Sequence, residues 1–177
     1  MLSHGERRIL LDLARGTVAA SARGERAPEL TNPSGALRER GAAFVTLRIR
    51  GELRGCIGHV QPVRPLWESV QEMAGAAAAR DARFAPLRPA ELAGLSIEIS
   101  VLSAMSPVRP DTIRVGTHGL YVTREARAGL LLPQVALEWG WDAPEFLRRT
   151  FEKAGIAYPD PGAGIFAFTV DRFSAEA

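Results

Sequence analysis

The chain has 177 residues, of which 46% are apolar and 24% charged, and its formal net charge at pH 7 is +2. These values are typical of one soluble globular domain, and so small a net charge gives no strong signal for nucleic-acid binding. The one cysteine, Cys56, excludes an intrachain disulfide and a four-cysteine zinc site. No apolar run reaches the roughly 18 residues of a membrane span, and the first residues lack the apolar segment of a signal peptide. We therefore expect a cytoplasmic protein.

The first half of the chain predicts two helices separated by a loop and a hairpin. Ser3 and Glu6 have the spacing of a capping box, and apolar residues recur behind them at helical intervals, which predicts a helix over residues 4–22. The other elements predicted in this half, besides the hairpin, are a long loop over 23–41, a helix over 66–80 and a half-buried strand over 95–101.

A β-hairpin is predicted around the cysteine. Residues 43–50 alternate as in a strand, and residues 51–52 suit a two-residue turn whose first member has positive φ, so the chain returns over 53–60. In this register Leu47 faces Cys56, which places the cysteine on the apolar side of the hairpin. A turn longer by one residue would exchange the two faces.

The second half of the chain predicts the same succession of elements. They are a hairpin of strands 119–123 and 129–132 with a longer turn, a short helix over 133–139, a helix from Asp142 to Gly155, and a last strand over 165–170. Residues 44–46 followed by Gly51 are similar to residues 121–123 followed by Gly129. Hairpin, helix and strand thus occur twice, which predicts an internal duplication.

Several motifs follow one another along the chain in a specific order. The first is Leu53-Arg54-Gly55-Cys56-Ile57-Gly58. The others are Asp81-x-Arg83-Phe84, Ile97-Glu98-Ile99-Ser100-Val101-Leu102, His118-Gly119-Leu120, Leu130-Leu131-Leu132-Pro133-Gln134-Val135-Ala136, Phe146-Leu147 and Lys153-Ala154-Gly155. Together they resemble the AMMECR family over residues 8–173. One departure is Tyr158-Pro159-Asp160-Pro161, where the family pattern has a tryptophan-containing segment.

The resemblance implies an α+β fold of two unequal lobes with a cleft between them. It also implies an association, in bacteria and archaea, with a Memo-like protein and a radical-SAM protein, in what is called the AmmeMemoRadiSam system. Proposals for the family range from an enzyme to a regulatory partner. We expect one α+β domain over residues 1–177, with an antiparallel or mixed sheet flanked by helices and halves of about 1–103 and 104–177.

Cys56 is the sharpest candidate for a chemical role. A thiolate is a good nucleophile whose pKa falls beside positive charge, and Arg54 on the same strand could supply that charge. His59 is an odd number of residues away and points to the other strand face, so a base would be His118 from the second half. The alternative is a small buried cysteine packed on Leu47, which the expected register favours.

Five further residues are candidates for binding an anionic ligand. Arg54 and Arg83 could hold a phosphate or carboxylate. Gly55 and Gly58 would let a ligand or a neighbouring backbone come close. Asp81 could orient Arg83 in such a site, or the two could be a structural pair at the end of a helix.

Glu98 lies in the middle of the strand at 95–101 and could be a general base, or a carboxylate that only faces solvent. No complete triad, phosphate-binding glycine loop or convincing metal-ligand set is present, so we expect neither a metal nor a cofactor. Two functions remain. One is a ligand-binding or adaptor component acting with Memo-like and radical-SAM proteins through a cleft around Arg54 and Cys56. The other is an enzyme that uses Cys56 or Glu98 on a small anionic substrate.

Overall fold

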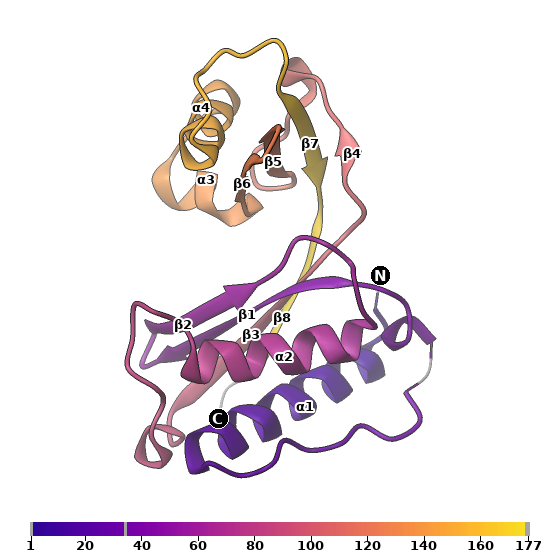
Figure 1. Ribbon diagram of the computed structural model, residues 1–177, viewed down its shortest axis with the longest axis vertical. Helices are drawn as coiled ribbons and strands as arrows, with labels where there is room; N and C mark the ends of the chain where they lie inside the picture. Colours follow the sequence, from indigo (N-terminus) through magenta and orange to yellow (C-terminus); the bar gives the residue numbers. More distant parts are fainter. Residues whose placement is uncertain (1, 34, 176–177) are drawn as a thin grey trace. The chain divides into compact units, whose positions relative to one another are not determined.

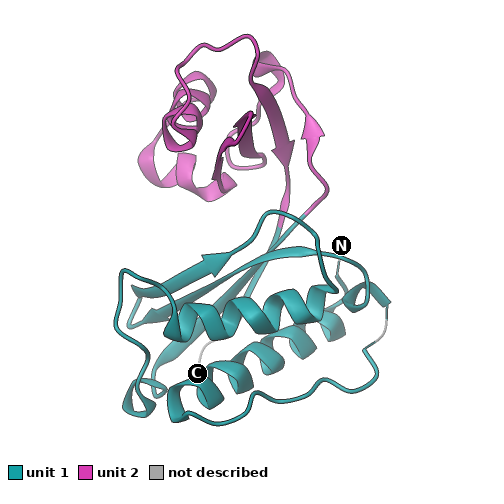
Figure 2. Ribbon diagram, viewed as in Figure 1, with its two compact units in different colours: residues 1–102, 171–177 teal, residues 103–170 magenta. Residues whose placement is uncertain are grey.

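The computed structural model describes residues 2–33 and 35–175, and the chain divides into two compact units (Figures 1 and 2). Unit 1 comprises residues 1–102 and 171–177, and unit 2 comprises residues 103–170. Each unit has its own buried apolar cluster and its own four-stranded sheet. Every ladder described within these sheets is antiparallel, so the predicted α+β class is confirmed.

The helices of the described residues are α1 (His4–Arg23), α2 (Leu66–Ala79), α3 (Pro133–Trp139) and α4 (Ala143–Ala154), with 3₁₀ turns η1 (Gly35–Leu37), η2 (Pro89–Glu91) and η3 (Pro110–Thr112). The strands are β1 (Ala42–Ile49), β2 (Glu52–Gly58), β3 (Leu95–Leu102), β4 (Ser106–Pro107), β5 (Gly119–Arg124), β6 (Arg127–Leu131), β7 (Gly164–Phe168) and β8 (Val170–Ala175). The predicted helix boundaries hold because their caps form. Ser3 and Glu6 make a reciprocal capping box, and Gly24 and Gly155 end α1 and α4 with positive φ.

Unit 1 has two layers. Its sheet has the strand order β2-β1-β3-β8, and α1 and α2 lie side by side on one face (Figure 1). That face supplies the core, in which Val45, Leu47 and Ile99 are fully buried. The alternate residues of the same strands point to the opposite face, and there Thr46 and Glu98 lie opposite each other on β1 and β3.

Unit 2 repeats this topology on a smaller scale. Its sheet has the order β4-β7-β5-β6, so the hairpin β5–β6 and strand β7 are arranged as β1–β2 and β3 are in unit 1. Helix α4 packs on β5 and β6 over buried Phe146 and Phe151. The predicted succession of hairpin, helix and strand therefore occurs in both sheets.

The turn of the first hairpin differs from the prediction. It is formed by Arg50 and Gly51, with φ of 52° and 83°, and Ile49 pairs with Glu52. Two consecutive positive φ values are the signature of a type I′ turn, which suits the twist of the strands it joins. An arginine rarely adopts positive φ, and for this reason the sequence favoured a turn that began one residue later, at the glycine.

A β-bulge then changes the pairing within the hairpin. The register shifts between Leu47 and Arg48, so Leu47 pairs with Gly55 and Thr46 pairs with Cys56. The prediction that Cys56 faces Leu47 on the apolar side is therefore wrong. Cys56 lies on the polar face of the sheet, because one extra residue in the bulged strand exchanges the two faces.

Two further details of the second half were not predicted. The β5–β6 turn is tight rather than long, because Arg124 pairs with Arg127 across Glu125 and Ala126. The predicted last strand ends at Phe168, and β8 follows it to become the outer strand of the unit 1 sheet.

Candidate functional site

The polar cluster around Cys56 begins with the backbone of that residue. Strand β2 is the outer strand of its sheet, and the N–H and C=O of Cys56 point away from β1. The N–H donates to Asp81 Oδ2 at 2.8 Å, and the C=O accepts from Arg83 Nη2 at 3.2 Å. The side chains of Asp81 and Arg83 thus hydrogen-bond the backbone N–H and C=O of Cys56 at the open edge of β2, as a neighbouring strand would.

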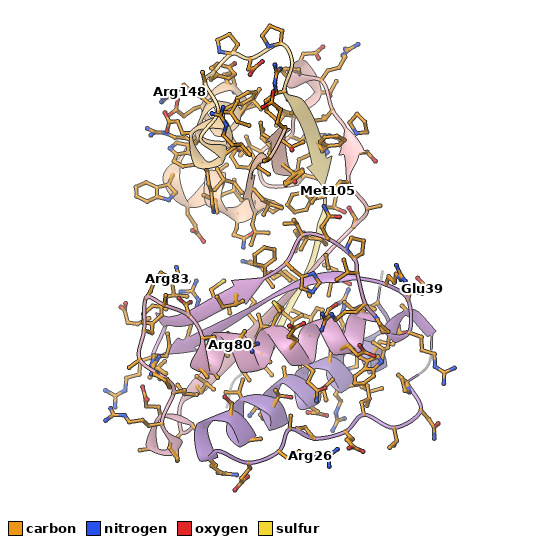
Figure 3. The ribbon with its side chains drawn as sticks, viewed as in Figure 1. Arg26, Glu39, Arg80, Arg83, Met105 and Arg148 are labelled. Atoms are coloured by element: carbon orange, nitrogen blue, oxygen red, sulfur yellow. The ribbon has the colours of Figure 1, made fainter. Side chains whose placement is uncertain are left out.

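Asp81 and Arg83 form a two-pronged ion pair just after α2. Arg83 donates from Nε to Oδ1 at 2.9 Å and from Nη2 to Oδ2 at 2.7 Å. The Arg83 hydrogen bonds hold the pKa of the Asp81 carboxyl well below its usual range, with the Cys56 N–H assisting, and Asp81 in turn raises the pKa of Arg83. Only 4% of the Asp81 side chain is exposed, against 56% for Arg83. Asp81 is therefore a permanently charged anchor, while Arg83 also reaches solvent (Figure 3).

Arg54, the unpaired residue of the bulge, is held by a residue that the sequence reasoning missed. Its Nε and Nη2 donate to the two carboxylate oxygens of Glu91 at 2.8 and 3.2 Å. Arg54 first and then the backbone N–H of Arg88 lower the pKa of Glu91 to about 2. The available signal was Pro89 followed by Glu91, because proline favours the first position of a helical turn and a carboxylate at the third can accept the N–H of the residue before it. Because Nε and Nη2 are engaged by Glu91 and only 16% of the side chain is exposed, Arg54 is a poor candidate for binding a free anion.

The thiol of Cys56 has one hydrogen-bond partner among residues 2–33 and 35–175, the hydroxyl of Thr46, with Sγ and Oγ1 3.3 Å apart. The thiol is half-buried, and Thr46 was missed because it becomes a neighbour only in the observed register. The Nδ1 of His59 lies 2.8 Å from the carbonyl of Gln61, so this ring is engaged locally. A hydroxyl is not a general base, so the described contacts give the thiol no group to take its proton.

Thr46 links the cysteine to Glu98 across the sheet. It pairs with Cys56 on β2 and with Glu98 on β3, so the three side chains form one row on the polar face. Strands are about 4.8 Å apart, which puts Cys56 and Glu98 about 10 Å apart, too far for direct proton transfer but within the span of one ligand. Glu98 is 24% exposed and lies 3.8 Å from Arg172 of β8.

The two glycines of the motif are used by the fold itself. A Cβ added at Gly55 would lie 2.3 Å from the carbonyl oxygen of Ala77, where β2 meets α2. A Cβ at Gly58 would lie 2.2 Å from the ring of Phe44. Gly55 and Gly58 thus make room for other groups of this chain, Ala77 and Phe44, rather than for a ligand.

His118 belongs to unit 2, where its Nδ1 accepts the backbone N–H of Arg114 at 3.2 Å. Within the part of the chain that the structure describes, no group of three or more histidine, cysteine, aspartate or glutamate side chains is placed to hold a metal ion. No described helix is both long and apolar enough to cross a membrane.

Comparison with known proteins gives consistent matches over nearly the whole chain. The family model AMMECR1 matches residues 11–176. A protein of Methanothermobacter thermautotrophicus is 42% identical over 183 residues, covering 97% of this chain and 95% of that protein. A protein of Thermococcus gammatolerans is also 42% identical, covering 95% of this chain and 89% of its own. The crystal structure of an uncharacterized protein from Pyrococcus horikoshii superposes with a TM-score of 0.89 at 34% identity, covering 98% of this chain and 93% of the other.

Proposed function

The chain belongs to the AMMECR1 family, and on that premise we propose that it is a binding component that holds an anionic ligand or partner segment beside Cys56. The observation that carries this proposal is the set of partners around the thiol. The sulfur has a hydroxyl neighbour in Thr46, and the described contacts include no histidine or free carboxylate at hydrogen-bond distance from it. Such a site can make contacts to a ligand but has no adjacent group to activate a nucleophile.

Arg83 supplies the anion-binding capacity of the proposed site. Its Nε and Nη2 are occupied by Asp81 and the Cys56 carbonyl, whereas its Nη1 makes no hydrogen bond to any described residue. The Arg83 side chain is 56% exposed, and its two hydrogen bonds to Asp81 orient the guanidinium. A pre-oriented guanidinium with free donors is well suited to a carboxylate or phosphate.

We further propose that the partners of this component are a Memo-like protein and a radical-SAM protein, as the family resemblance implies. The test is a pull-down of each partner from the same organism with the wild-type chain, with Arg83→Gln, and with Arg38→Gln as an exposed arginine control. Loss of partner with Arg83→Gln alone is the expected result. Equal recovery by all three chains would show that Arg83 has no part in the interaction.

The enzyme alternative is favoured by the charge next to Cys56. Arg83 hydrogen-bonds the carbonyl of that residue, and the charged form of Cys56 contributes, after Asp81, to raising the pKa of Arg83. A thiolate beside a guanidinium would be a nucleophile toward a small anionic substrate. Glu98 is a carboxylate on the same face of the unit 1 sheet as Cys56.

The pH dependence of iodoacetamide labelling distinguishes the two functions, because the chain has a single cysteine. The binding proposal predicts slow labelling at neutral pH, and slower labelling in the presence of inorganic phosphate. Arg83→Gln should remove the phosphate protection, while Arg38→Gln should retain it. Rapid labelling with a midpoint far below the ordinary value would instead favour the enzyme.

A further inference from the structure

We propose that the groove along the outer side of α2 binds an extended peptide segment with a basic residue at one end and an acidic residue at the other. This site is separate from the one around Cys56. Helix α2 packs on the apolar face of the unit 1 sheet, and Cys56 lies on the opposite face.

The shape of the groove suits an elongated ligand. It has a volume of about 630 Å³ and is lined by the second half of α1, the segment that follows it, and α2 with the flanking residues Arg64 and Arg80. A helix of the length of α2 is about 21 Å long. Most small-molecule sites enclose their ligand on nearly all sides, whereas Ala79 and Arg80 at one end of this groove are exposed. A peptide that lies along α2 can contact the groove over its whole length and does not need to be enclosed on all sides.

Beside the larger side chains of Trp67 and Gln71, part of the groove is lined by small groups. Thr17 is buried and its hydroxyl donates to the carbonyl of Leu13 at 2.8 Å, so its polar atom is satisfied within α1. Its methyl group faces Gly75, where an added Cβ would lie 3.6 Å from it. Ala79 follows Gly75 one turn later. Side chains this small let a peptide backbone approach the helix closely.

The two ends of the groove carry opposite charges without partners. Within the described residues, neither the carboxylate of Glu68 nor the guanidinium of Arg80 makes a hydrogen bond or ion pair, whereas Arg64 and Glu72 pair with each other at 2.5 Å. Glu25, also on the groove, lies 4.0 Å from Arg23. Figure 3 shows Arg80 at the end of α2.

The spacing of these charges sets the length of the ligand. Glu68 and Arg80 are twelve residues apart on one helix, or about 18 Å. An extended chain advances about 3.3 Å per residue, so about 18 Å is five to six residue-to-residue steps, and a basic and an acidic residue at the ends of a segment of six or seven residues match the two charges. Glu68 lies in the first turn of α2 and Arg80 at its end, so both charges also stabilise the helix dipole. A change in folding stability on replacing either residue is therefore not evidence of peptide binding.

The test uses four blocked, dansyl-labelled hexapeptides that share a Ser-Ala-Ala-Ser centre and end in Lys and Glu, two Lys, two Glu or two Gln. Wild-type protein should bind the Lys and Glu peptide about fivefold more tightly than any other, as measured by fluorescence anisotropy at low salt. Glu68→Lys should make the two-Glu peptide the preferred one, and Arg80→Glu should make the two-Lys peptide preferred. Glu52→Lys, an exposed carboxylate of the same unit outside the groove, should leave the wild-type order unchanged.

A blocking variant tests the location of the binding site. Ala79→Trp at this exposed position should abolish binding while the far-ultraviolet spectrum and melting temperature stay close to those of the wild type. Cys56→Ser should bind the peptide normally, which separates this proposal from the site around Cys56. Equal binding of the four peptides by wild type, no binding at millimolar peptide, or undiminished binding by a folded Ala79→Trp variant would each overturn the proposal.

Discussion

The two sheets share a topology but carry opposite chemistry at equivalent positions. In unit 1, Thr46 pairs with Cys56 on one side and Glu98 on the other, so a thiol, a hydroxyl and a carboxylate form a row across the face turned away from the helices. The equivalent row of unit 2 consists of Leu130, Tyr121 and Phe166. The fold accepts apolar and aromatic residues at these positions, so its topology does not require the polar row. This supports a binding role for the row in unit 1.

In contrast to these rows, the glycines next to them have the same role in the two units. Gly55 of β2 lies against Ala77 of α2, and Gly129 of β6 lies against Ala154 of α4. They are thus the true counterparts of each other, whereas Gly51, which the sequence comparison matched to Gly129, lies in a turn. Both units thus share a close contact between a strand glycine and the helix that packs on that strand.

The largest expected effect is on that contact. Gly55→Ala and Gly129→Ala would each place a Cβ within 2.4 Å of helix backbone, so each should cost more than about 4 kcal/mol of the free energy of unfolding, as measured in urea. Gly75→Ala is the control, because its Cβ would meet nothing closer than 3.6 Å. In mid-helix it should be neutral or stabilise by up to about 1 kcal/mol. A mild effect at either strand glycine would contradict the shared role.

The next effect compares the rows at one equivalent position. Leu130→Ser should lower the free energy of unfolding by about 2 kcal/mol, because it removes apolar contact area from an aromatic row. Cys56→Ser should lower it by less than about 1 kcal/mol, because the half-buried thiol lies off the core and beside a hydroxyl. Equal losses in urea titrations would mean that both rows are structural.

The ion pair of Arg54 and Glu91 should make a pH-dependent contribution to the free energy of unfolding. The pKa of Glu91 is lowered to about 2 in the folded chain, so its contribution is present above the unfolded value near 4.5 and is lost as the pH falls toward 2. Wild type should therefore lose about 1 to 2 kcal/mol more stability than Glu91→Gln between pH 5 and pH 2, after allowing for partial solvent exposure. Parallel stability curves for the two proteins would contradict this.

The smallest expected effect is at Glu98. Its ion pair with Arg172 is long, at 3.8 Å, and the arginine is half exposed, so Glu98→Gln should change the unfolding free energy by less than about 0.5 kcal/mol. Glu72→Gln, which breaks the shorter pair with Arg64, is a matched exposed control. A large loss at Glu98 alone would identify the carboxylate as structural and weaken its place in the binding row.

The sequence by itself determined the features that depend on neighbouring residues. The capping box at Ser3, the glycine at Gly155 and the alternation of residues 95–101 each act within one turn or one strand, and all three elements formed as predicted. The order of motifs identified the family, and the succession of hairpin, helix and strand in both halves was visible as well.

Only the tertiary structure decided which face of the sheet carries the cysteine. Register depends on a type I′ turn that forces Arg50 into positive φ and on a bulge that leaves Arg54 unpaired, and neither has a reliable local signal. The partners of the candidate site also come from distant segments. Glu91 reaches Arg54 from 37 residues away, and Asp81 reaches the N–H of Cys56 from 25 residues away. Such contacts are set by the packing of α2 and the loop after it on β2, which no short window of sequence specifies.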